Sequence, residues 1–207
     1  MIGDELQYSP IQRDAQSSYQ LLTHLVVPRP IAWITTVNAA GLVNLAPFSF
    51  YNLMSTAPRV VVFSPTLKAD GSKKDTLNNL VFLGECVIHV STEDLAQRIN
   101  LTAKALPPDE SEVILAELHT VPSTVVTPPR IVEAAAAMEC VVRQIIPLGA
   151  LPGAGNLVIA EIVMVHIRDE LLGVDGNIDP QLLRAVGRLG GDNWCKITET
   201  FPMKRPV

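Results

Sequence analysis

The chain of 207 residues carries a formal net charge of −5 and has a sequence pI near 5.3. This length fits one domain that buries a core without disulfides or a structural metal, and the acidic balance argues against nucleic-acid binding. Only 18% of the residues are charged while 48% are hydrophobic. We therefore expect part of the surface to be covered in a homodimer.

The amino-terminal segment predicts neither a signal sequence nor a membrane helix. Residues 1–18 are polar and acidic and lack an apolar core, and no apolar run reaches the ~18–20 residues that a membrane helix needs. The cysteines, Cys86, Cys140 and Cys195, lack C-x-x-C spacing, which favours neither a zinc site nor a disulfide framework. We expect a cytoplasmic protein with no membrane contact and an amino-terminal arm over residues 1–18.

A β-hairpin is predicted within residues 27–52, VPRPIAWITTVNAAGLVNLAPFSFYN, after a short helical turn at 18–22. The two prolines exclude a helix at its start. An apolar, β-branched strand from Ile31 to Val37 breaks at residues 38–41, which have the composition of a hairpin loop, and the return strand begins near Leu42.

This hairpin combines aromatic residues with small polar ones and has a single charge, Arg29. Its small hydrogen-bonding side chains are Thr35, Thr36, Asn44, Ser49 and Asn52. Such a mixture suits a flat, mostly apolar ligand with polar edges. The alternative is an ordinary barrel hairpin whose hydroxyl groups cap strand ends.

The next elements are a bend at 54–58, a buried strand at 59–64 and a polar, basic loop at 65–76. The loop leads into a helix with Asp75 or Thr76 as its N-cap. A helix N-terminus presents free N–H groups and a positive dipole end, and Lys73 and Lys74 precede it, which is an arrangement that can hold a phosphate. The alternative is a solvated loop with an ordinary cap.

The remaining elements are a strand at 85–91, helices at 92–105 and 111–118, and strands from residue 124 onward. The strand at 85–91 places His89 on a half-polar face, where we expect a structural hydrogen-bonding role. Two long strands at 136–149 and 156–169 should pair antiparallel through a Gly- and Pro-rich loop. Residues 158–167 are apolar at nearly every position, so a helix or a second subunit should cover their outer face.

The chain ends with a short helix at 181–185 and the glycine-rich segment VGRLGGDNW. Its glycines allow the backbone to approach a ligand or a neighbouring chain closely. Arg188 and Trp194 then either flank a ligand or pack in a carboxy-terminal turn against the barrel.

Standard catalytic motifs are absent from the sequence. There is no G-x-G-x-x-G after a strand, no Walker loop, no G-x-S-x-G and no H-E-x-x-H. The four histidines, His24, His89, His119 and His166, are too scattered to predict a metal site. We therefore assign no catalytic residue and no metal ligand, and any nicotinamide should bind as a transient substrate.

The run PRPIAWITT followed by NLAPFSFYN resembles the signature of the flavin reductase-like family, FMN-binding split barrels that include flavoredoxin. Lys74-Asp75-Thr76 and the run at 186–191 fall where that family has similar elements. The resemblance spans roughly residues 19–194. It implies a mainly β fold with α insertions, a Greek-key-like antiparallel split β-barrel, as a single domain over residues 1–207 with a helical insertion at 92–120.

The same resemblance implies an NAD(P)H:flavin oxidoreductase that transfers hydride through flavin N5, so that the cofactor performs the bond chemistry. FMN is the expected cofactor, with FAD as an alternative, and NAD(P)H is the expected co-substrate. A monooxygenase or another redox protein is the expected partner. One alternative is a flavoredoxin-like FMN electron carrier without its own nicotinamide oxidation. Another is a barrel that has lost its cofactor and only oligomerises.

The resemblance also implies which residues contact the cofactor. Trp33, Thr35 and Thr36 should lie along the isoalloxazine and ribityl, and the segment 44–52 should contact the ring edge. Lys74 to Thr76 should hold the phosphate and ribityl end, and Arg188 should lie near the ring or the incoming nicotinamide. The complete predicted set is Trp33, Thr35, Thr36, Asn44, Ala46, Pro47, Ser49, Asn52, Lys74, Asp75, Thr76 and Arg188.

Overall fold

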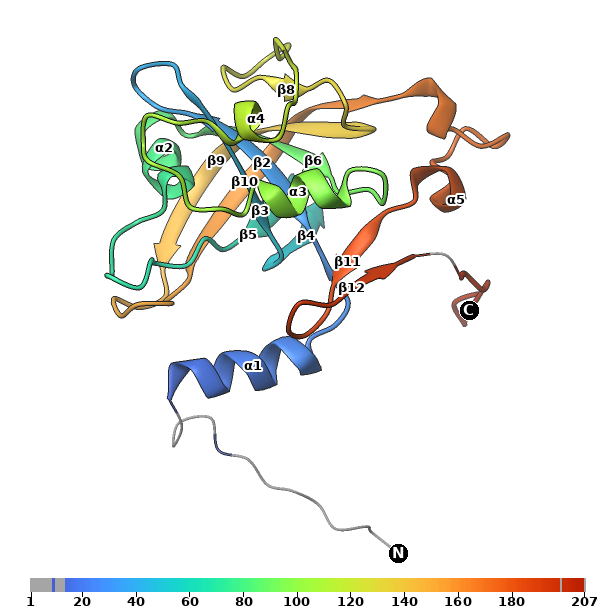
Figure 1. Ribbon diagram of the computed structural model, residues 1–207. Coiled ribbons are helices and arrows are strands. Elements are labelled where there is room, and N and C mark those ends of the chain that lie inside the picture. Colours follow the sequence, from blue (N-terminus) through green and yellow to red (C-terminus); the bar gives the residue numbers. More distant parts are fainter. Residues whose placement is uncertain (1–8, 10–13, 198, 207) are drawn as a thin grey trace, which may run out of the picture.

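The computed structural model describes residues 9, 14–197 and 199–206 (Figure 1). Its helices are α1 (Ala15–Leu25), α2 (Asp75–Leu83), α3 (Ala96–Leu101), α4 (Glu112–Leu115) and α5 (Pro180–Leu183), with a 3-10 turn at Asp169–Leu171. Its strands are β1 (Arg29–Pro30), β2 (Ala32–Val37), β3 (Val43–Phe48), β4 (Tyr51–Thr56), β5 (Arg59–Phe63), β6 (Glu85–Val90), β7 (Thr120–Val121), β8 (Arg130–Ile131), β9 (Ala136–Pro147), β10 (Asn156–Ile167), β11 (Val186–Arg188) and β12 (Trp194–Lys196).

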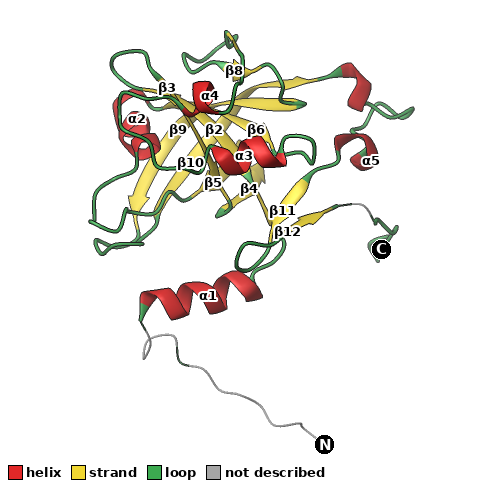
Figure 2. Cartoon of the chain, in the orientation of Figure 1, coloured by secondary structure: helices red, strands yellow, loops and turns green. Residues whose placement is uncertain are grey.

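Seven strands form one antiparallel sheet in the order β3-β2-β6-β9-β10-β5-β4, shown in yellow in Figure 2. The sheet curls, because Phe48 on β3 packs against Phe63 on β5 with ring centroids 6.1 Å apart. A small sheet, β1-β11-β12, and the β7-β8 pair complete the strands of the described chain. The predicted mainly β, antiparallel fold with helical insertions is confirmed.

The predicted hairpin is present as β2 and β3, with Ala32 opposite Phe48 and Val37 opposite Val43. Its loop forms as the sequence predicts, because the Asn38 Oδ1 atom accepts the N–H groups of Ala40 and Leu42, each at 2.9 Å. The Asn38 side chain thus accepts hydrogen bonds from loop N–H groups that are not paired between the two strands.

Two buried clusters cover the two faces of the sheet. Trp33, Leu45 and Ile99 belong to a cluster between β2, β3 and the segment that carries α3 and α4. Ile34, Phe63 and Ile88 belong to the cluster inside the curled sheet. The segment after β6 therefore packs directly on the strand that carries the predicted ligand contacts.

The amino-terminal helix is longer than the single turn that the sequence predicts. The expected arm at 1–18 lies mostly outside the described residues, and α1 begins at Ala15 because the Asp14 carboxylate accepts the Ser17 N–H at 2.8 Å. Arg29 holds this helix, since its guanidinium donates to the carbonyls of Thr23, Val26 and Leu189 at 2.6–2.9 Å. In Figure 1, α1 lies beside the turn between β11 and β12.

The predicted bend at 54–58 is confined to a turn at 57–58, because β4 stays paired with β5 as far as Thr56 opposite Arg59. The helices predicted at 92–105 and 111–118 are also shorter. The first begins only at Ala96, since Thr92 forms a bridge to Ala185 and the Glu93 N–H donates to Arg184. The second ends at Leu115 in α4.

Of the strand predicted from residue 124, only the two residues of β8, Arg130 and Ile131, form a strand. The backbone N–H groups of residues 124–126 donate to the buried Glu139 carboxylate instead of to a neighbouring strand. His89 is fully buried rather than on a half-polar face, but its structural role is as predicted: its Nδ1 lies 2.9 Å from the Trp33 carbonyl, and its Nε2 accepts the Ile131 N–H at 2.9 Å.

β9 and β10 pair along their length as predicted. The outer face of β10 is only partly covered, because Val163 and Val165 remain 38% and 50% exposed, and no described helix covers them. Among the described residues, none of the helices has the length and apolar character needed to cross a membrane.

Candidate functional site

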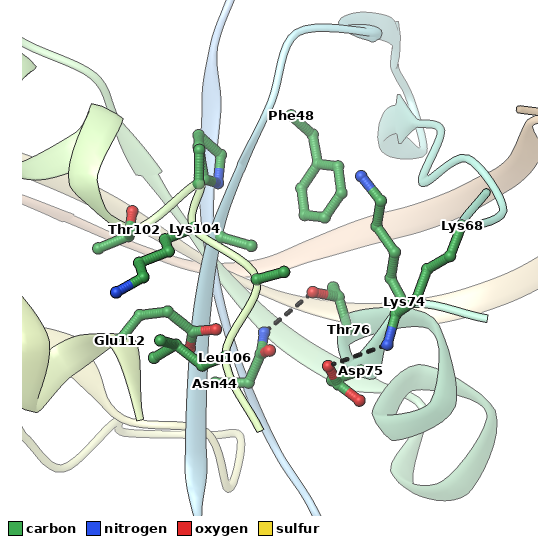
Figure 3. A pocket seen from close by; sticks show the side chains of 14 residues that line it. Asn44, Phe48, Lys68, Lys74, Asp75, Thr76, Thr102, Lys104, Leu106 and Glu112 are labelled. Carbon is green, nitrogen blue, oxygen red and sulfur yellow. Dashed lines mark hydrogen bonds and ion pairs between the residues drawn. The ribbon is translucent and has the colours of Figure 1, made fainter. Parts of the chain in front are cut away.

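A cavity of about 220 Å³ lies where β3, the first turn of α2 and the segment after α3 meet (Figure 3). β3 contributes Asn44, Ala46, Pro47 and Phe48. The other lining residues are Lys68, Lys74, Asp75, Thr76, Thr102, Ala103, Lys104, Ala105, Leu106 and Glu112. Six of the predicted contacts, Asn44, Ala46, Pro47, Lys74, Asp75 and Thr76, are therefore brought together.

β3 forms the wall of the cavity because it is an edge strand. Pro47 lies opposite Trp33 on β2 and has no N–H to give to the ladder, so residues 43, 45 and 47 point their backbone groups away from β2. Ser111 Oγ donates to the Val43 carbonyl at 2.5 Å, and the Leu45 N–H donates to Glu112 Oε2 at 2.9 Å. The short helix α4 thus covers one half of this edge.

The first turn of α2 supplies the opposite wall. Its N-cap is Lys74, not Asp75 or Thr76, and in the described chain no side chain accepts its free N–H groups. The predicted caps are otherwise engaged: Asp75 lies 3.6 Å from Lys68 Nζ, and Thr76 Oγ1 accepts from Asn44 Nδ2 at 2.9 Å. The helix therefore presents unpaired donors and its positive dipole end to the cavity.

Lys74 makes this end of the cavity cationic. Its Nζ lies 5.6 Å from the centroid of the Phe48 ring. Burial lowers the pKa of the Lys74 ammonium group, and the nearby positive charge of Lys68 lowers it further. An anionic ligand would relieve both effects, because a negative charge favours the charged form of a lysine.

Three predicted contacts lie behind the cavity wall and do not line it. Trp33 is fully buried and its indole N–H donates to Thr102 Oγ1 at 2.9 Å, while the Thr35 hydroxyl donates to the Pro129 carbonyl at 2.7 Å. Thr36 Oγ1 accepts from Asn79 and Asn44 side chains at 3.0 and 3.4 Å. Thr36 therefore orients Asn44, which does line the cavity.

A second hollow of about 150 Å³ adjoins the first and shares Pro47 and Ala103 with it. Arg188, Ser49 and Asn100 line it, and the Arg188 guanidinium lies 5.7 Å from the centroid of Trp194. The last residue of β11 and the first residue of β12 thus line this second hollow. Asn52 lies elsewhere, in a hollow against α1 where its Oδ1 accepts the Leu53 N–H.

Lys68, Lys104 and Glu112 line the cavity but were not among the predicted contacts. Glu112 is only 7% exposed, and burial raises the pKa of its carboxyl group. In the sequence Glu112 follows Ser111 at a predicted helix start, so it looked like an ordinary first-turn acid. Only its contact with the edge of β3 marks it as a site residue.

Known proteins share this architecture over nearly the whole chain. Residues 24–180 match the model of the flavin reductase like domain. Nitrilotriacetate monooxygenase component B from Bacillus cereus is 37% identical, with a TM-score of 0.92 over 97% of this chain and 100% of that chain. The 2-nitrobenzoate 2-nitroreductase NbaA from Pseudomonas fluorescens is 30% identical, with a TM-score of 0.86 over 98% of this chain and 97% of that chain.

A protein with a split barrel domain from Shewanella frigidimarina is 18% identical, with a TM-score of 0.83 over 98% of this chain and 100% of that chain. It supports the fold, and the predicted split barrel is confirmed. The family match covers far more than half of the residues and includes the hairpin, β3 and the first turn of α2. The chain belongs to the flavin reductase-like domain family.

Proposed function

We propose that this chain binds FMN in the cavity between β3 and α2 and acts as an NAD(P)H:flavin oxidoreductase. The observation that carries this proposal is the uncapped first turn of α2, with Lys74 and Lys68 beside it, at one end of a cavity with an apolar wall. Free N–H groups, a dipole end and two ammonium groups suit a phosphate.

The residues present fit the rest of the cofactor as well. Ala46, Pro47 and Phe48 offer an apolar surface for a flat ring, and the outward carbonyl of Pro47 offers an acceptor at its edge. When bound, the flavin supplies hydride and electron transfer at N5. The protein binds it, orients it and excludes water, which is why no acid–base pair is needed.

The second hollow suits the nicotinamide co-substrate, because it adjoins the apolar end of the cavity through Pro47 and Ala103. Arg188 supplies a cation there, and Trp194 supplies a flat surface. Ser49 lines this hollow and is assigned to it, whereas Trp33, Thr35 and Thr36 are assigned to the supporting layer. Asn52 remains a proposed contact at the margin of the site.

A monooxygenase is the partner that we propose, because a chain of nearly the same fold is named as component B of nitrilotriacetate monooxygenase. Reduced flavin made here would then be consumed by the partner. We also propose a homodimer, since Val163, Val165 and Ile167 leave a partly exposed apolar face on β10.

Anaerobic absorption spectroscopy tests this proposal. Purified protein, FMN and either NADH or NADPH are mixed, and the visible flavin band is followed. The band should bleach far faster than without protein. Bleaching at the protein-free rate with both nucleotides would contradict the reductase.

The same sample separates the two alternatives. A carrier would bind FMN without oxidising either nucleotide. A barrel without a cofactor would show no rise in melting temperature on addition of FMN, because a ligand that binds only the folded state must stabilise it.

A further inference from the structure

The two ends of the cavity differ in their chemistry. The α2 end presents donors and cations, with Lys74 and Lys68 beside the free N–H groups of the first turn. The part of the cavity beside α4 presents acceptors, because Glu112 and Asn44 both line it. Figure 3 shows the Glu112 carboxyl group pointing toward Asn44 and not toward the lysines at the start of α2.

Glu112 has few protein partners for a buried carboxylate. Its Oε2 accepts the backbone N–H of Leu45 at 2.9 Å, its own backbone N–H also favours the charged form, and no side chain of the described residues donates to it. Lys104 lines the same cavity without forming an ion pair with Glu112. A carboxylate has about four lone-pair positions, and a buried polar group that is left partly unpaired costs free energy. The position of Glu112 is therefore suited to accepting further hydrogen bonds from a ligand.

Asn44 adds a second acceptor beside it. Both Asn44 Nδ2 contacts go to hydroxyl groups, to Thr76 Oγ1 in the cavity wall at 2.9 Å and to Thr36 Oγ1 behind it at 3.4 Å. Its Oδ1 is then left as an acceptor. A pair of acceptors selects a ligand segment that carries donors, and the dianion of a phosphate group, which prevails at neutral pH, carries none. Hydroxyl groups of a polyol chain match this pair.

We propose that Glu112 accepts hydrogen bonds from the ribityl hydroxyl groups of the flavin, and so makes the site specific for flavins that carry this chain. The inference rests on the proposed function, because it assumes that the cavity holds a flavin. It adds a binding residue that acts between the phosphate end and the ring end of the cavity.

Three flavins separate the parts of the ligand in a binding test. FMN carries phosphate and ribityl, riboflavin carries ribityl alone, and lumiflavin carries neither. The dissociation constant of each is measured by quenching of flavin fluorescence with wild type, with Glu112→Gln and with the control Glu110→Gln. The glutamine keeps an oxygen for the Leu45 N–H, and Glu110 is exposed and does not line the cavity.

Glu112→Gln should raise the dissociation constants of FMN and riboflavin by about tenfold, the loss expected for a charge-assisted hydrogen bond. That of lumiflavin should stay within about twofold, and Glu110→Gln should match wild type. Equal effects on all three flavins, or no effect on riboflavin, would overturn the inference.

Two further outcomes keep the test decisive. If Glu112→Gln does not fold, the wild-type protein decides, because riboflavin should then bind at least about tenfold tighter than lumiflavin. Equal wild-type affinities for these two would refute the role of Glu112. If wild type binds FMN normally while Glu112→Gln is unchanged, only this inference fails, whereas wild type that binds no flavin overturns the proposed function as well.

Discussion

Two buried glutamates, one on β9 and one at the start of α4, show how differently this fold uses the same side chain. Glu139 on β9 is completely buried, and its carboxylate accepts the N–H groups of residues 124–126 at 2.6–3.0 Å and lies 2.6 Å from His166 Nε2. Glu112 is nearly as buried, but only the Leu45 N–H donates to it from a neighbouring element.

The difference appears in their pKa values. Burial alone would raise the pKa of Glu139, but its donors outweigh burial and lower the pKa to about 2. Burial prevails at Glu112 and raises its pKa. A carboxylate saturated by the protein is a structural element, whereas an unsaturated one that faces a cavity remains available to a ligand.

The largest expected effect is a loss of stability in Glu139→Gln. Four donors lose a charged acceptor in the interior, so the free energy of unfolding should fall by about 3–5 kcal/mol. The matched variant Glu112→Gln should lose less than about 1 kcal/mol, because the Leu45 N–H keeps an acceptor. Urea denaturation measures both, and similar losses in the two variants would break the comparison.

His89, like Glu139, is a buried titratable group whose hydrogen bonds are made within the protein, and it makes the stability depend on pH. Burial is the main reason that its pKa falls from 6.5 to about 4, so the folded state holds a neutral ring between Trp33 and Ile131. The unfolded chain takes up the proton first as the pH falls. The free energy of unfolding should therefore be highest above pH 6.5 and should fall by about 3 kcal/mol in total as the pH decreases toward 4.

Nuclear magnetic resonance of the ring protons checks this directly, together with urea denaturation across the same range. A His89 ring that titrates at the ordinary value of about 6.5 would contradict this assignment.

Lys74→Ala tests the proposed ligand cavity, which Lys74 lines. Loss of the half-buried ammonium beside the α2 N-terminus should raise the dissociation constant of FMN by about 10- to 100-fold. Riboflavin, which lacks the phosphate, should change by less than about twofold. Lys73→Ala is the control, because Lys73 is exposed and does not line the cavity. Fluorescence titration measures all six values, and equal losses for both flavins would exclude a phosphate at Lys74.

The smallest effect is expected for Thr36→Val. The valine removes one of the two hydroxyl groups that hold Asn44, so the FMN dissociation constant should rise about two- to fourfold. The neighbouring variant Thr35→Val loses only the bond to the Pro129 carbonyl, away from the cavity, and should leave FMN affinity unchanged. An equal effect of the two variants in fluorescence titration would remove the proposed support of Asn44 by Thr36.

Local patterns in the sequence predicted the sheet well where they specify the backbone directly. The Asn38 loop, the β-branched runs of β5 and β6 and the long pair β9-β10 all formed where the residues indicate strands. The segment at 124–134 did not, because the donors of its backbone are claimed by Glu139, which is distant in sequence. Such a competition is invisible to periodicity.

In the site, too, the residues with local sequence signals could be predicted, and those that depend on distant contacts could not. Asn44 to Pro47 and Lys74 to Thr76 could be predicted, since each motif carries its own local chemistry. Alternation along β2 does not reveal that Trp33, Thr35 and Thr36 are covered on both faces by the segments at 102 and 129 and by α2. Glu112 was missed for the reverse reason, because the edge of β3 that it contacts is 67 residues away in sequence.

Calorimetric titration of the wild-type protein with FMN and with riboflavin tests the central claim most directly. The account predicts one saturable FMN site per chain, with FMN bound at least about tenfold more tightly than riboflavin because the α2 end of the cavity holds the phosphate. An absence of binding heat with FMN, or equal affinity for the two flavins, would contradict it.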